Sequence, residues 1–215
     1  MVRYYPHMSG LADKPFRDAL VVGSLLAPEG AAAYATAMRW WRWPSPEGGR
    51  AITFVTPKRK QAMHVVLLGV PFELVFIKPE RMFGAALLGE PGLRIRVTEP
   101  ERTVVDMFDR SDLCGGVPAV AAALTTAWPR LDIEALSGCL ERFAGGTVPR
   151  RLGYLAEHLG LLAPGDPILA GWRALIGSGY SLLERGGQAA GPFVRRWGLR
   201  VNVEEFASRP GGRSR

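Results

Sequence analysis

Cysteine, histidine and lysine are scarce in this chain of 215 residues. Cys114 and Cys139 are its two cysteines, too few for a disulfide framework or a four-cysteine zinc site. We expect both to be free thiols in a reducing compartment. Lysine is outnumbered by arginine 4 to 23, a ratio that GC-rich coding alone would also produce. The sequence predicts no metal site and no cofactor.

Long apolar runs are missing as well. No apolar stretch reaches the ~18 residues needed to span a bilayer. The first ten residues, MVRYYPHMSG, lack the apolar segment of a signal peptide. We therefore expect a cytoplasmic protein that does not associate with membranes.

The residues of a catalytic site are not assembled in this sequence. His7, His64 and His158 lie far apart, and neither cysteine lies in a recognisable nucleophile turn. A metal-dependent nuclease needs two carboxylates beside an activating lysine. The nearest approach to that pattern is Glu73 with Lys78, which a strand would place on opposite faces. The sequence predicts a protein that is not an enzyme and has no catalytic residues.

The charge is strongly positive. The net charge is +7 and the pI about 9.9, which favours an anionic partner: nucleic acid, an acidic protein face or a membrane surface. Residues 50–82 carry six basic side chains against two acidic ones. Lys58-Arg59-Lys60 is the densest cluster, and it either binds such a partner or forms a solvated turn.

Periodicity and composition divide the chain into an N-terminal lead-in, one domain and a C-terminal tail. Residues 1–15 show no periodicity, and 206–215 form a basic, Gly- and Pro-bearing tail that we expect to be disordered. The domain spans 16–205, with a strand-rich part over 51–98 and a helical part over 99–177. We predict an α+β fold of one compact unit.

The predicted sheet is small and mixed, and it covers about 51–97 with a returning strand near 197–203. Residues 51–56 are apolar and β-branched, and 64–68 with 72–77 flank a short turn as a hairpin would. Residues 93–97 alternate, with Arg94 and Arg96 on one face and apolar residues on the other. Such alternation is typical of a half-buried strand with a basic outer face.

Helical periodicity dominates elsewhere. Residues 31–43 predict a helix in which the three tryptophans, Trp40, Trp41 and Trp43, pack a core more readily than they stack on bases. Thr98, Asp132 and Thr147 are placed to cap helices that follow them. Asp106 is spaced to pair with Arg102 on the first of these helices.

Arg150 and Arg151 lie in the first turn of a predicted helix, where the macrodipole disfavours positive charge. Either an internal carboxylate or an acidic external partner would explain them. We predict that they extend a basic face with the basic residues of the strand-rich part. The full predicted face comprises Lys58, Arg59, Lys60, Lys78, Arg81, Arg94, Arg96, Arg150 and Arg151.

An ordered series of segments resembles the AbiEi family of type IV abortive-infection antitoxins. The segments are VTPKRK, IKPERMFG, LRIRVTEPERTVVDMFDR, LCGG, TVPRRLGYLAEHLGLL and RWGLRVNV, spread over roughly Phe16 to Val203. Fifteen residues precede the first matching helix, too few for the winged-helix DNA-binding domain that such proteins usually carry. The family positions matched are Lys58, Arg59, Lys60, Lys78, Arg81, Phe83, Gly84, Arg102, Asp106, Arg150, Arg151, Gly153, Tyr154, Trp197, Arg200 and Asn202.

The resemblance implies a function and a partner. The expected function is a non-enzymatic antitoxin in a bacterial phage-defence system, counteracting a nucleotidyltransferase-like toxin by direct binding or by opposing its effect. The alternative is a DNA-binding regulator of its own operon, with DNA bound weakly in the absence of a winged helix. We assign Arg102, Asp106, Gly153 and Trp197 to folding rather than to the partner surface.

Overall fold

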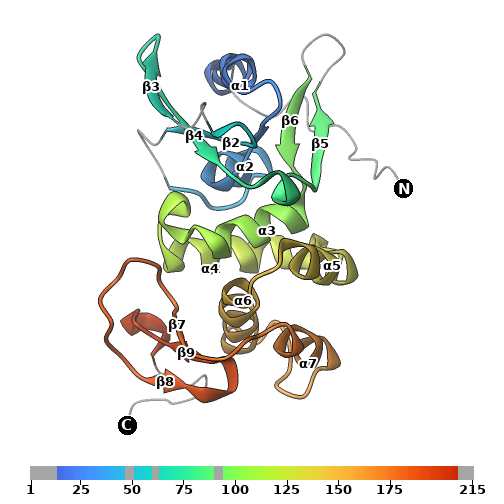
Figure 1. Cartoon of the computed structure of the whole chain (residues 1–215), viewed down its shortest axis with the longest axis vertical. Coiled ribbons are helices and arrows are strands. Elements are labelled where there is room, and N and C mark those ends of the chain that lie inside the picture. The colour runs from blue at the N-terminus through green and yellow to red at the C-terminus, as the bar shows by residue number, and fades with distance from the viewer. Residues whose placement is uncertain (1–13, 47–50, 60–62, 90–93, 208–215) are drawn as a thin grey trace. The chain divides into compact units, whose positions relative to one another are not determined.

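The structure is a computed structural model of the whole chain, and it describes residues 14–46, 51–59, 63–89 and 94–207. Two compact units share these residues. Unit 1 comprises the described residues up to Arg42 and from Ala51 to Glu99, and unit 2 comprises Trp43–Pro46 and the residues from Pro100 onward. The fold class is mixed α/β, as predicted (Figure 1).

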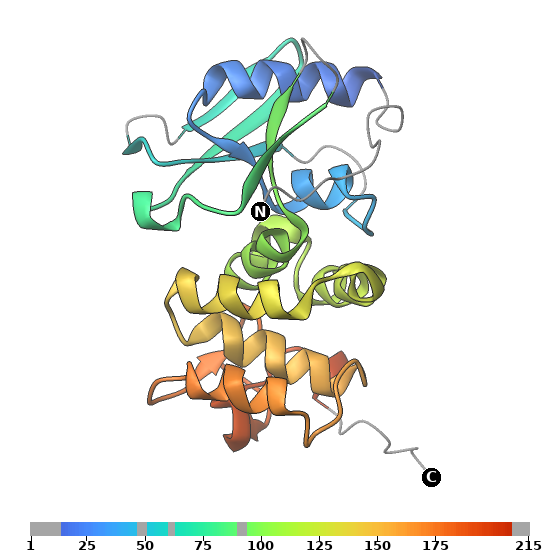
Figure 2. The same ribbon diagram turned by 90° about the vertical axis from the view of Figure 1, so that its right-hand side faces the viewer.

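Unit 1 is built on a six-stranded sheet in the order β3-β4-β2-β1-β6-β5. Its strands are β1 (Ala31–Ala32), β2 (Ile52–Thr56), β3 (Met63–Leu67), β4 (Val70–Phe76), β5 (Ala85–Leu88) and β6 (Ile95–Thr98). The helices α1 (Lys14–Leu26) and α2 (Tyr34–Trp40) both pack on β2, and Figure 2 shows α1 lying across the sheet. All five residues of β2 are buried, as expected of a central strand covered on both faces.

The core of unit 1 depends on close approach between α1 and β2. A Cβ added to Gly23 would lie 2.3 Å from the ring of Phe54, so only glycine lets the helix approach the fully buried phenylalanine this closely. Trp40 and Trp41 are buried, and the indole of Trp41 donates to the Thr98 carbonyl at 2.9 Å. Trp43, which belongs to unit 2, is buried as well. The prediction that the tryptophans pack a core is confirmed.

Unit 2 contains five helices and a second sheet. The helices are α3 (Pro100–Asp109), α4 (Val117–Ala127), α5 (Ile133–Phe143), α6 (Thr147–His158) and α7 (Pro167–Ala174). A three-stranded sheet follows in the order β7-β9-β8, made of β7 (Ser181–Leu182), β8 (Phe193–Val194) and β9 (Leu199–Arg200) (Figure 1). Trp172 and Trp197 are the largest fully buried side chains of this unit.

Local signals in the sequence set several helix starts. Asp132 accepts the amide of Ala135 at 2.9 Å and begins α5 as predicted. Asp166 does the same for α7 through the amide of Ile168, and Pro167 follows at the first helical position. Thr147 is not a cap: it is the first residue of α6, and its hydroxyl lies 3.3 Å from that of Ser181.

Three predicted elements are corrected. Residues 31 and 32 are not helical but form β1, hydrogen-bonded between β2 and β6. The strand predicted near 197–203 exists as β9, yet it joins the separate sheet of unit 2. Phe206 is buried, so the predicted disordered tail does not start there; residues 208–215 lie outside the described part.

Within the described residues, no helix combines the length and apolar character that crossing a bilayer requires.

Candidate functional site

Strand direction gathers basic residues at one edge of the sheet in unit 1. β2 and β4 are adjacent and parallel, so Lys58-Arg59 and Lys78, which follow them, leave at the same edge. β6 runs opposite to β2, with β1 between them, so Arg94 and Arg96 enter at that edge. We call this set the basic edge: Lys58, Arg59, Lys78, Arg94 and Arg96.

The register supports this grouping. Ala32 lies opposite both Phe54 and Val97, which places Ile95 level with Thr56. Two strand spacings separate β2 from β6, about 10 Å. All five side chains of the basic edge belong to exposed residues, so their charges face solvent over a width that a nucleic-acid backbone or an acidic protein face can span.

The contacts around the basic edge leave it positive. Lys58 Nζ lies 2.7 Å from Glu29 Oε1, and the guanidinium carbon of Arg59 lies 6.0 Å from the centroid of the Phe76 ring. Both partners of the Lys58 ion pair are about half exposed, and such pairs add little stability. Glu29 therefore offsets only part of the charge of the basic edge.

Three residues of the predicted face do not join the basic edge. Arg81 lies in the short helix Pro79–Arg81 on the crossover from β4 to β5, and it is half-buried. Arg150 and Arg151 are buried in unit 2, so the prediction that they extend the face is wrong. Lys60 lies outside the described residues.

The Arg150 side chain binds backbone carbonyls of its own unit rather than an external partner. Its guanidinium donates to the carbonyls of Ser178 at 3.0 Å and Gly198 at 2.8 Å, and also to those of Gly177 and Gly179. Four carbonyl oxygens stabilise the buried cation, so neither a carboxylate nor an external partner is needed. The first turn of α6 is thereby joined to the segment before β7 and to β9.

Arg151 has a similar role. It donates to the carbonyls of Leu182 at 2.9 Å and Phe108 at 2.8 Å, which connects α6 to β7 and to the end of α3. Burial lowers the pKa of the Arg151 guanidinium, and the carboxylate of Asp109 partly opposes that shift.

The residues assigned to folding are core residues. Arg102 and Asp106 form an ion pair at 2.8 Å with side chains 1% and 2% exposed. A Cβ on Gly153 would lie 2.2 Å from the ring of Trp197. These assignments are confirmed, and Asn202 proves structural too: its amide pairs with both backbone polar groups of Glu184, at 2.8 and 3.0 Å.

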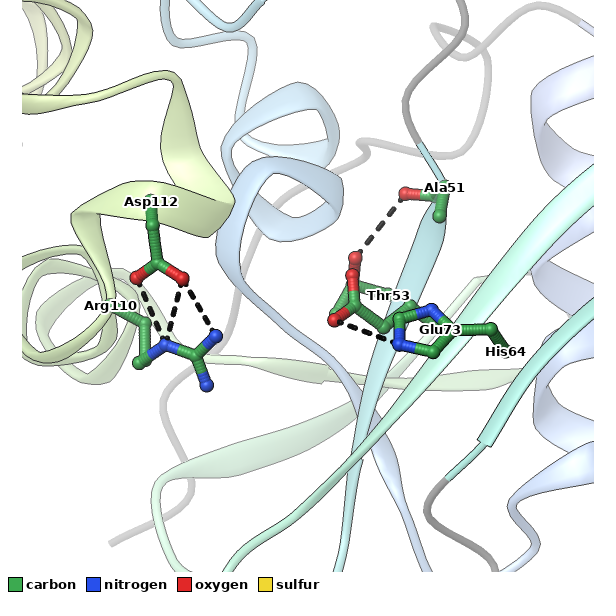
Figure 3. Close-up of polar contacts among 6 residues, drawn as sticks. All are labelled: Ala51, Thr53, His64, Glu73, Arg110 and Asp112. Carbon is green, nitrogen blue, oxygen red and sulfur yellow. Dashed lines mark hydrogen bonds and ion pairs between the residues drawn. The ribbon is translucent and has the colours of Figure 1, made fainter. Parts of the chain in front are cut away.

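No group of three or more His, Cys, Asp or Glu residues that could hold a metal occurs in the described ranges. Glu73 instead faces His64 across the β3–β4 pair, with Oε1 4.0 Å from Nε2 (Figure 3). Asp112 is bound by Arg110 at 2.7 Å (Figure 3); burial raises the pKa of its carboxyl, but the hydrogen bonds and charge of Arg110 outweigh burial and lower it.

A cavity of about 600 Å³ lies within unit 2, and sequence reasoning missed it. Burial raises the pKa of Tyr154 in its wall and lowers that of His158, whose shift the carboxylate of Glu205 partly opposes. The hydroxyl of Tyr154 donates to the Phe206 carbonyl. The sequence signal that could have indicated this cavity is the close spacing of aromatic and arginine residues at 193–197. Other lining residues are Glu157, Phe193, Arg195, Arg196 and Trp197.

Comparisons with known proteins show a shared fold. No protein-family model matches the chain, and no curated protein matches its sequence. Among solved structures, it is similar to the RV2827C protein from Mycobacterium tuberculosis, with a TM-score of 0.55 and 15% sequence identity. The match covers 86% of this chain and 66% of that protein.

Proposed function

We propose that this chain is a non-enzymatic antitoxin of a type IV abortive-infection system, and that the basic edge is the surface through which it counteracts a nucleotidyltransferase-like toxin. The observation that carries the proposal is the convergence of Lys58, Arg59 and Lys78 from β2 and β4 with Arg94 and Arg96 from β6. All five positions belong to the segments that resemble the AbiEi family. The surface has two candidate targets, an acidic face of the toxin and the nucleic acid on which the toxin acts.

Physical chemistry favours binding over catalysis at this edge. Five exposed cations lie at or just beyond the ends of three strands of one sheet, and positive charge of this kind steers anionic partners and raises their association rate. Guanidinium groups also bind carboxylates and phosphates in a two-pronged geometry.

A DNA-binding regulator of its own operon is the second candidate, and it is favoured by the same positive charge. In residues 14–46, however, α1 and α2 are separated by β1, which belongs to the sheet. That arrangement differs from a helix-turn-helix, in which two consecutive helices present one to the major groove.

Charge reversal tests the antitoxin function. Lys58→Glu with Arg59→Glu should abolish rescue of cells that express the toxin encoded beside this gene. The free energy of unfolding should change by less than ~0.5 kcal/mol, because both side chains are exposed. Rescue is measured as colony survival, and stability by urea denaturation of the purified variant.

The matched control is Arg130→Glu with Arg173→Glu, two exposed arginines of unit 2 with the same total change of charge. This control should rescue like the unaltered protein. If the Lys58→Glu, Arg59→Glu variant folds and still rescues fully, the basic edge is only a solvated surface and the proposal is wrong. If the unaltered protein represses its own promoter but never rescues, the regulator is the correct function.

A further inference from the structure

Two aromatic rings are exposed side by side in unit 2. Tyr180 is 53% exposed and Phe193 57% exposed. Their ring centroids are 5.0 Å apart at an interplanar angle of 78°. Aromatic residues that serve the core are buried, as Trp172 and Trp197 are in the same unit. A pair held together in solvent is typical of a binding surface.

The small sheet separates two kinds of side chain on its faces. Leu182, Arg200 and Phe193 are paired in one row across β7, β9 and β8, so they share a face. Leu199 in the neighbouring row points the other way and is fully buried. The outward row therefore carries Phe193 with the Arg200 guanidinium carbon 5.0 Å from its ring centroid.

The cavity of about 600 Å³ adjoins this face, because Phe193 lines it as well. Arg195 and Arg196 contribute positive charge to its wall. The one acidic side chain of the lining, Glu157, is already engaged: it pairs with Arg196 at 2.9 Å and accepts the indole N–H of Trp197. Glu204 and Glu205 are exposed and not part of the lining, although the carboxylate of Glu205 acts on the pKa of His158 in the cavity wall.

We propose that this surface binds single-stranded nucleic acid. We call it the aromatic face and define it as Tyr180, Phe193, Arg195 and Arg200 with the adjoining cavity. Bases stack on Phe193 and Tyr180, one base enters the cavity, and the two arginines contact phosphates. The volume of the cavity, about 600 Å³, lies within the range of about 300–1,000 Å³ that is usual for small-molecule sites, and a single nucleobase fits inside it.

A single strand fits these groups better than a duplex or an acidic protein does. Exposed aromatics on a small sheet, with arginines between them, stack unpaired bases regardless of sequence. A duplex keeps its bases stacked and offers only phosphates. An acidic protein face would meet the arginines, but it has no flat rings to fill the aromatic pair and the cavity. Antitoxin activity is not needed for this binding, since the basic edge belongs to unit 1.

Stacking and charge are separable by experiment. The full chain is titrated against fluorescein-labelled twelve-nucleotide RNA, DNA of the same sequence and the DNA duplex, and anisotropy is read at several salt concentrations. Tyr180→Ala with Phe193→Ala should weaken single-strand binding at least tenfold, because both rings on which bases stack are removed. The dependence of affinity on salt should not change, since no charge is removed.

The control is Leu25→Ala with Leu68→Ala, which removes two exposed apolar side chains of unit 1 and should leave affinity unchanged. Arg195→Gln with Arg200→Gln should instead reduce the salt dependence. The RNA and DNA titrations show which strand is preferred. Duplex binding as tight as single-strand binding, or an aromatic variant with unchanged affinity, overturns the proposal. Toxin capture that requires Tyr180 and Phe193 without any oligonucleotide binding would make this a protein-docking surface and overturn it as well.

Discussion

Gly153 in α6 lies against the indole of Trp197, which is 1% exposed. The indole N–H is bound to Glu157 one turn along the same helix, so the ring cannot swing away without breaking that hydrogen bond. Gly153→Ala should therefore lower the free energy of unfolding by about 1–3 kcal/mol, the usual cost of overpacking a core. Urea denaturation followed by tryptophan fluorescence measures the change.

Gly138 provides the control for that substitution. It lies in α5, is exposed, and has no atom within 4 Å of an added Cβ. Gly138→Ala should raise the free energy of unfolding by up to about 1 kcal/mol, because alanine is the better helix former. Opposite signs for the two glycines are expected, and equal effects would show that the Trp197 contact does not constrain α6.

At the scale of elements, α6 holds the C-terminal segment of unit 2 through Arg150. Four carbonyls from two chain segments converge on one guanidinium. A lysine keeps the charge but has three donors on a point-like group, which cannot reproduce the planar fork. Arg150→Lys should lower the free energy of unfolding by about 1–3 kcal/mol, because buried carbonyls lose their donors.

Hydrogen exchange locates the effect of Arg150→Lys. Amides of residues 177–183 and 198–200 should exchange faster, while those of α5 stay protected. Arg173→Lys, an exposed arginine of α7, should change neither stability nor exchange. If Arg150→Lys is as stable as the unaltered protein and fails only in toxin rescue, Arg150 acts on a partner after all.

The elements that sequence predicted well carry strong local signals. The β3–β4 hairpin follows alternation around a turn, and α5 follows its Asp132 cap and an apolar stripe. Ala31–Ala32 was predicted as the start of a helix because Tyr34, Met38 and Trp41 recur at helical spacing just after it. Its place as a strand comes from hydrogen bonds to β2 and β6, segments more than 20 and 60 residues away. Tertiary pairing overrides propensity in so short a strand.

The candidate site was predictable to the same extent. Arg94 and Arg96 alternate with buried Ile95 and Val97 as their sequence pattern indicates. The order of strands, which brings β6 within two positions of β2, has no local signal. Arg150 and Arg151 carry the same charge as Lys58, and sequence could not show that carbonyl oxygens would accept their hydrogen bonds. The pairing of Tyr180 with Phe193 likewise depends on β7 and β8 sharing β9 as a neighbour.

At the scale of the whole molecule, each of the two units has its own core and its own proposed binding surface. Each unit has its own sheet and its own buried aromatic residues, Phe54 in unit 1 and Trp197 in unit 2. The basic edge belongs to unit 1 and the aromatic face to unit 2. The two proposed surfaces thus belong to different units, so variants of the basic edge can be compared with variants of the aromatic face.

Duplex DNA should be bound weakly and without sequence preference by this chain. A net charge of +7 attracts phosphates, but base readout needs an element that enters a groove, and α1 packs on β2 instead. Binding that rests on phosphate contacts releases counterions, so affinity should fall by orders of magnitude between about 50 and 200 mM salt. Anisotropy titrations with the DNA upstream of the gene and a scrambled sequence of equal length should give the same curves. Nanomolar binding at physiological salt that distinguishes the two sequences would contradict this and favour the regulator.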